Sequence, residues 1–151
     1  MKVSRSGGAE RLKKLLKEME RTKVEVGYFP EAVYPDGTPV AYVAAIHVFG
    51  YPQGGIPPRD YFRTTTESKA PEWGRQVAGA VAGAVQGKVQ FSDALGAVGA
   101  QAAGDIGRAL SKLKEPKLAE ATIRAKGHDK PLVGLTGQLL QDITFKVSTD
   151  A

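Results

Sequence analysis

Two kinds of hydrophobic spacing alternate along the chain, and each predicts a different element. Within residues 9–22, four apolar side chains recur at helical intervals and form a single stripe, which predicts an amphipathic helix. These are Leu12, Leu15, Leu16 and Met19. Strict alternation of apolar and polar positions over Lys23–Phe29, and again over Ile143–Ser148, predicts two strands.

An uninterrupted apolar run over Val40–Phe49 predicts a buried helix in the first half of the chain. A turn sequence at residues 34–37 precedes it, and Thr38 followed by Pro39 is typical of a helix N-terminus. Gly50 follows the run and is typical of a helix C-terminus. Because the run is short, a buried strand remains the alternative.

Small residues dominate the middle of the chain, where residues 77–110 contain ten Ala and seven Gly. The pattern predicts a helical hairpin over about 72–114, with its turn near 88–92 and its second helix starting at Asp93. Small residues spaced by four form two ridges: Gly79, Gly83 and Gly87, and then Gly96, Ala100 and Gly104. Each interior Gly costs about 1 kcal/mol relative to Ala, so these helices depend on packing. The hairpin packs either on its own domain or, for full order, on an assembly.

The elements around the hairpin complete an α+β prediction. A helix starts near Asp60, and Pro71 either kinks it or opens a second helix. A short helix is expected within 117–126, and Thr136 is expected to cap a last helix that ends at Asp142 with Leu139 and Leu140 facing inward. We therefore expect a small antiparallel sheet packed with helices, with the long Ala/Gly-rich hairpin in the middle.

Charge changes this picture at the N-terminus only. The chain has a formal net charge of +5, and residues 1–24 hold eight basic and three acidic side chains, while the remainder is balanced. The sequence therefore predicts a basic amphipathic arm over residues 1–22, followed by a single domain over 23–151. The polar face of the arm is either a solvated helix back or a contact for DNA or an acidic neighbouring subunit. The candidate contact residues are Lys13, Lys14, Lys17 and Arg21.

Candidate chemistry adds little. The chain has no Cys and only two His, His47 and His128, and it contains no esterase elbow, P-loop or dinucleotide fingerprint. The uncharged stretch between Arg75 and Lys88 is too short to span a bilayer. We therefore expect no catalytic site, no cofactor, no metal site and no membrane contact.

The order of several motifs over residues 24–147 resembles the small virion-morphogenesis proteins of tailed bacteriophages, which are variously called neck, tail-completion or putative tail-component proteins. The matching segments are Val26–Phe29, Val43–Gly50, Ile56–Arg63, Thr122–Gly127, Pro131–Val133 and Thr136–Leu139. Three positions depart from the family pattern: Val48 replaces an acid, Asp60 replaces Pro, and Gly134–Leu135 replaces Ile-Asp.

The resemblance implies a structural subunit of the virion that is made in the host cytoplasm and forms a ring at the head–tail junction or the top of the tail. Its expected partners are further copies of itself, neighbouring connector or tail proteins and, non-specifically, genomic DNA. The residues that the resemblance assigns to assembly are Pro57, Pro58, Arg59, Phe62, Thr136, Gly137 and Leu139. The alternative function is a sequence-independent DNA-binding module that acts through the basic N-terminal helix.

Overall fold

The computed structural model describes residues 5–133 and 137–150. Helix α1 (Arg5–Arg21) leads directly into strand β1 (Thr22–Gly27). The elements that follow are α2 (Val40–Phe49), the 3₁₀ turn η1 (Pro52–Gly54), α3 (Tyr61–Val85), α4 (Phe91–Lys112), α5 (Glu120–Lys126), α6 (Gln138–Gln141) and β2 (Thr144–Thr149). Helices packed with a two-stranded antiparallel sheet confirm the expected α+β class.

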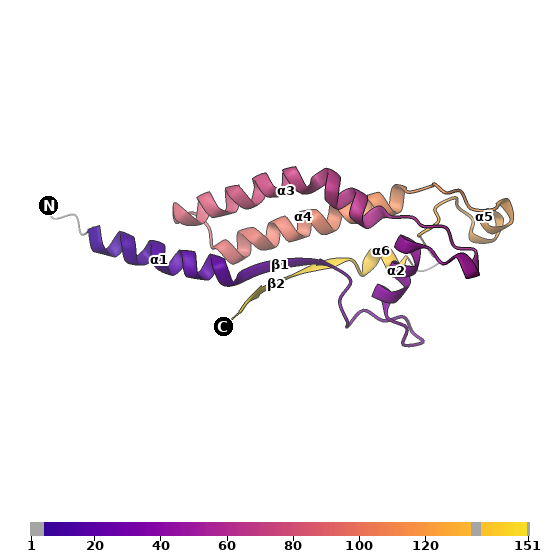
Figure 1. Cartoon of the computed structure of the whole chain (residues 1–151), viewed down its shortest axis with the longest axis horizontal. Helices are drawn as coiled ribbons and strands as arrows, with labels where there is room; N and C mark the ends of the chain where they lie inside the picture. Colours follow the sequence, from indigo (N-terminus) through magenta and orange to yellow (C-terminus); the bar gives the residue numbers. More distant parts are fainter. Residues whose placement is uncertain (1–4, 134–136, 151) are drawn as a thin grey trace.

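The molecule is elongated along the hairpin that α3 and α4 form (Figure 1). Strands β1 and β2 lie along α4, whereas α2, α5 and α6 gather at the end of the molecule opposite the turn of the hairpin. The strands pair antiparallel, with Val24 opposite Val147 and Val26 opposite Phe145. These are the apolar positions of the two alternating patterns, so both patterns face α4 from one side of the sheet.

Two apolar clusters hold the hairpin at its two ends. The main core lies where α2, the start of α3, the end of α4 and α6 meet, and consists of Val40, Ala44, Tyr61, Ile106, Leu110, Leu132 and Leu139. A smaller cluster near the hairpin turn consists of Ala80, Ala84, Phe91 and Leu95. Leu15 and Met19 of α1 pack against this smaller cluster, so α1 is docked on the hairpin.

Gly99 lets the sheet approach α4 closely. A Cβ atom at this position would lie 2.6 Å from Cγ2 of Val24 and 2.9 Å from Cδ2 of Phe145, which is too close for a side chain. At Gly79 on α3, in contrast, a Cβ would meet nothing within 4 Å. The spacing of four found in the sequence therefore does not identify the glycine under the tightest packing.

Several boundaries differ from the expectations. The N-cap of α2 is Pro39 rather than Thr38, and α4 begins at Phe91 rather than at Asp93. Helix α3 continues through Pro71 as a single element, which Figure 1 shows as bent rather than broken. A proline inside a helix removes one hydrogen bond and crowds the preceding turn, and packing against α4 along the hairpin compensates for that loss here.

The last helix also begins differently. Gly137 is the N-cap of α6, with a left-handed backbone at φ 64°, whereas the expected cap, Thr136, lies outside the described residues. Across residues 5–133 and 137–150, every helix falls short of the length or the apolar character that a bilayer crossing requires.

Candidate functional site

Helix α2 is apolar on all sides but buries only one of them. Val40 and Ala44 are 0% and 5% exposed and belong to the main core. Tyr42 and Phe49, which lie two helical turns apart on another face, are 61% and 79% exposed. A helix that is apolar all round is normally covered all round. The expectation of a helix at 40–49 is confirmed, but the expectation that it is buried is wrong for this outer face.

The proline-rich loop after α2 folds back on the end of that helix. Tyr51 and Ile56 exchange backbone hydrogen bonds of 2.8 and 3.0 Å, and the Arg59 amide donates to the His47 carbonyl at 2.7 Å. Gly50 has a φ of 79°, and a Cβ there would lie 2.9 Å from the Pro58 nitrogen. Only glycine fits this approach.

The folded loop places exposed apolar side chains next to the outer face of α2. Tyr51 is 48% exposed, Pro58 is exposed, and Pro57 is half-buried. We define the aromatic–proline surface as Tyr42, Phe49, Tyr51 and Pro58.

Phe62 borders this surface rather than belonging to it. Its half-buried ring packs beside Gly27, and it lines a cavity of about 300 Å³ together with Phe49 and Val48. The neighbouring Asp60 caps α3, because its Oδ1 accepts a hydrogen bond of 2.9 Å from the Arg63 amide. Asp60 stands where the phage proteins that the sequence resembles have proline, and its carboxylate stabilises the N-terminus of α3.

Arg59 does not face outward as the assembly assignment would require. The residue is 6% exposed, and its Nε and Nη2 atoms donate to the Pro116 carbonyl at 3.1 and 2.6 Å. Burial lowers the pKa of the guanidinium below its usual value. Within this chain, Arg59 therefore ties the proline-rich loop to the segment that follows α4.

Leu139 is likewise internal. Its side chain is 4% exposed in the main core, and its carbonyl accepts a hydrogen bond of 2.8 Å from the Tyr28 hydroxyl. The Tyr28 hydroxyl also lies 2.9 Å from that of Tyr61. Burial raises the pKa of both tyrosines, that of Tyr61 to about 12, so both stay neutral. Leu139 thus holds α6 in the main core.

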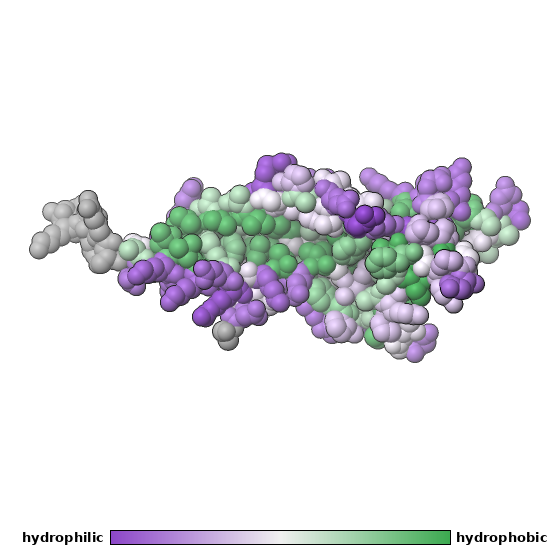
Figure 2. All heavy atoms as spheres, viewed as in Figure 1, coloured by the Kyte–Doolittle hydropathy of each residue, from purple (hydrophilic) through white to green (hydrophobic). Residues whose placement is uncertain are grey.

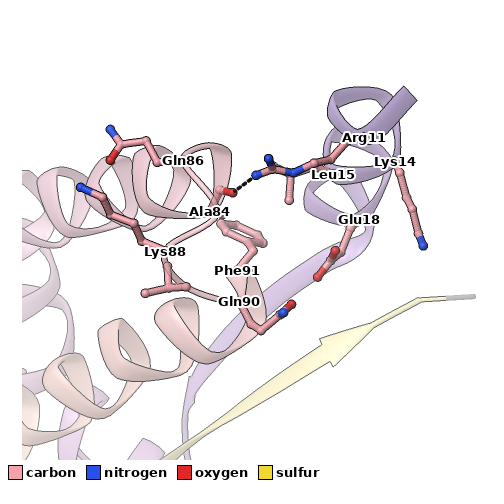
Figure 3. A pocket seen from close by; sticks show the side chains of 11 residues that line it. Arg11, Lys14, Leu15, Glu18, Ala84, Gln86, Lys88, Gln90 and Phe91 are labelled. Atoms are coloured by element: carbon pink, nitrogen blue, oxygen red, sulfur yellow. Dashed lines mark hydrogen bonds between the residues drawn. The ribbon is translucent and has the colours of Figure 1, made fainter. Parts of the chain in front are cut away.

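A second candidate surface lies between α1 and the turn of the hairpin (Figure 3). This cleft of about 610 Å³ has Leu15, Ala84 and Phe91 in its walls. Lys14 and Lys88 also line it, and Figure 3 shows the Lys14 side chain directed away from the hairpin.

Arg11 fixes one wall of this cleft. Its Nη2 atom donates to the Val85 carbonyl at 3.0 Å and lies 3.5 Å from the Ala84 carbonyl, at the C-terminus of α3. A cation at this helix end satisfies carbonyls that lack a partner within the helix. Sequence reasoning counted Arg11 only as part of the basic arm, because nothing local in the sequence links it to residues 84 and 85.

The four candidate DNA-contact residues are all exposed on α1. They are Lys13, Lys14, Lys17 and Arg21. Among the described residues, the ion pair recorded for this group joins Lys13 Nζ to Glu10 Oε1 at 3.8 Å, and such an exposed pair contributes little to stability. The structure therefore leaves these cations accessible to a partner.

A buried carboxylate inside the hairpin is a feature that the sequence did not reveal. Asp105 is 5% exposed and accepts hydrogen bonds from Trp73 Nε1 at 2.8 Å and Gln101 Nε2 at 3.1 Å, and it pairs with Arg108. Burial raises the pKa of Asp105, but these donors lower it by more, so that it lies below its usual range. Because Trp73 lies on α3 whereas Gln101 and Arg108 lie on α4, Asp105 joins the two helices and stabilises their packing.

The two histidines lie in different surroundings. Nδ1 of His47 is buried without a hydrogen-bond partner, and burial together with the nearby Arg59 and Lys126 cations lowers the pKa of His47. Nδ1 of His128 accepts from the Lys130 amide at 3.2 Å. Within the part of the chain that the structure describes, no group of three or more metal-binding side chains comes together.

Neither a known protein family, nor a curated protein sequence, nor a solved structure matches this chain. The resemblance to phage neck proteins therefore rests on the order of its sequence motifs alone.

Proposed function

We propose that this chain is a non-catalytic structural subunit of a tailed phage particle, where copies of it form a ring at the head–tail junction or the top of the tail. The outer face of α2 is the observation that supports this most. Phe49 is 79% exposed on a helix that has no polar face to present to water. Exposed aromatic clusters of this kind mark protein–protein contacts.

A ring also needs a second, different surface to receive the first. An open groove lies between α4 and β2, with Ala100 and Gly104 on the helix side and Phe145 on the strand side. Small residues leave room there for side chains of another molecule. Contact between two unlike surfaces is heterologous, and its repetition closes into a ring when the rotation allows.

The magnitude of the contact can be set from the exposure of Phe49. With 79% of a side chain of about 200 Å² exposed, its burial contributes at most about 4 kcal/mol at about 25 cal/mol per Å². Replacing Phe49 and Tyr42 by Gln should therefore weaken self-association by at least about tenfold, the equivalent of about 1.4 kcal/mol. The fold should persist, because both side chains are exposed in the monomer.

Sedimentation velocity of the purified chain over a concentration series measures this association. Val85→Gln is the matched control, since Val85 is 44% exposed but lies at the hairpin turn. Mass spectrometry of purified virions should find the chain in low, stoichiometric copy number. A chain that stays monomeric at every concentration and is absent from finished particles would refute the proposal.

A further inference from the structure

The apolar stripe of α1 is only half covered by the rest of the molecule. Leu15 and Met19 pack against the hairpin, as their place in the smaller cluster shows. Leu12 and Leu16, one helical turn apart, are 44% and 49% exposed. The sequence predicted a single stripe, and the structure divides it into an inner pair and an outer pair.

The end of the hairpin continues this exposed surface. Val85 at the end of α3 and Val89 in the turn are 44% and 46% exposed. A further cavity of about 190 Å³ lies between the two elements, lined by Leu12, Leu15 and Val85 among others. We define the tip surface as Leu12, Leu16, Val85 and Val89. Figure 2 shows hydrophobic side chains gathered over this end of the molecule, bordered by a row of hydrophilic ones along α1.

Cations border the tip surface. Lys13 and Lys17 follow the two exposed leucines by one position each, and Lys88 lies in the hairpin turn between the two valines. From Arg11 to Lys17, α1 has four basic residues and no acidic one. Lys14 and Lys88 line the adjoining cleft of about 610 Å³. Glu18 also lines that cleft and Glu10 pairs with Lys13, so the surface is apolar at its centre and has a rim that is positive on balance.

We propose that the tip surface docks an acidic amphipathic helix of a partner protein. Apolar side chains at helical spacing on that helix would cover the tip surface, and flanking carboxylates would pair with the rim lysines. The docked helix would bury apolar area that the chain itself leaves in water, and the positive rim would favour a helix of negative charge. This role is separate from the ring contact of α2 and does not depend on it.

Charge and apolar area also favour an acidic helix over two other possible partners of the tip surface, a second copy of the chain and duplex DNA. Pairing of the tip surface with the same surface of a second copy would bring together two N-terminal segments that each hold eight basic and three acidic residues. Duplex DNA would neutralise the lysines but would leave Leu12 and Leu16 uncovered, because phosphate contacts are electrostatic. An acidic apolar helix satisfies both features at once.

The test uses a fluorescein-labelled synthetic peptide with Leu at helical spacing and Glu at most other positions. Two comparison peptides have the same composition with the Leu stripe scrambled, or Lys in place of Glu. Fluorescence anisotropy with the full chain should show binding of the first peptide at least about tenfold tighter than of either comparison. Raising the salt concentration from about 0.05 M to about 0.5 M should weaken it, because the Debye length shortens.

Variants assign the binding to the tip surface. The double substitution Leu12→Gln/Leu16→Gln should weaken peptide binding at least about tenfold, the equivalent of about 1.4 kcal/mol. Lys13→Gln/Lys17→Gln should weaken it and reduce its dependence on salt. Phe49→Gln, a change of an exposed apolar residue at the other end, should leave it unchanged. If circular dichroism shows that the Leu variant has lost helix, Val85→Gln tests the hairpin side of the same surface.

Three results would overturn the proposal. The first is equal binding of the striped and scrambled acidic peptides, and the second is peptide binding that neither the Leu variant nor Val85→Gln alters. The third is evidence that something other than an acidic helix occupies the surface, either DNA or a second copy of the chain. Duplex DNA bound equally by wild type and the Leu variant, with no peptide binding, would assign the cations to phosphates. A dimer abolished by the Leu variant would assign the surface to a second copy.

Discussion

Replacing Arg59 by Ala tests whether this residue stabilises the fold or contacts another subunit. The buried guanidinium donates twice to the Pro116 carbonyl, and the substitution leaves that carbonyl without these donors. A hydrogen bond from a charged donor contributes about 1.5–3 kcal/mol. Burial and, to a smaller extent, the nearby Arg59 charge lower the pKa of Lys126. Removing the Arg59 charge relieves this repulsion and offsets part of the loss. We expect the free energy of unfolding to fall by about 2 kcal/mol, also because the aliphatic stem no longer packs.

Urea unfolding followed by circular dichroism and by the fluorescence of Trp73, the single tryptophan, measures this change. For a chain of this size, a loss of about 2 kcal/mol corresponds to a fall in melting temperature of roughly 4–8 °C. Phe49→Gln is the control, because an exposed side chain should change stability by no more than about 0.5 kcal/mol while weakening self-association. An Arg59→Ala chain that unfolds at the wild-type urea concentration but no longer self-associates would refute the internal role.

Two further substitution sets test the hairpin. Asp105→Asn should lower the free energy of unfolding by about 2 kcal/mol at pH 7, because it weakens the hydrogen bond from Trp73. In urea titrations, the difference in free energy of unfolding between wild type and variant should narrow as the pH falls below about 4. A carboxyl whose pKa is lowered by folding loses its contribution to stability when it is protonated. A pH-independent difference would contradict this. Gly99→Ala should lower the melting temperature because the new Cβ meets Val24, whereas Gly79→Ala, in open space, should raise stability by up to about 1 kcal/mol; equal effects would contradict the packing argument.

Much of the fold could be predicted because its signals are local. The alternation over 23–29 and 143–148 predicted the strands to within one or two residues, and the register then follows from keeping apolar positions on one face. The turn at 34–37 formed as expected, with the Gly37 amide donating to the Tyr34 carbonyl at 2.8 Å. Boundaries were less accurate, as at the cap of α2, because neighbouring residues compete for the same position.

The candidate surfaces could be predicted only in part. Pro58 and the lysines of α1 are exposed, as a contact role requires. Arg59 was misplaced because the sequence does not show that the Pro116 carbonyl lies within reach across 57 positions of chain. The exposure of Phe49 was missed for the opposite reason, since an apolar run predicts burial whether the cover comes from the same chain or from another molecule.

The sequence by itself determined the helical and strand periods, the glycine that ends α2, and the gathering of excess positive charge in the first 24 residues. Only the tertiary structure decided which glycine meets the sheet, that Arg11 caps α3, and which half of the α1 stripe stays in water. The physical reason is that periodicity depends on neighbours along the chain, whereas burial and pairing depend on segments that meet only after folding. The tip surface and the outer face of α2 are what remains apolar once those segments have met.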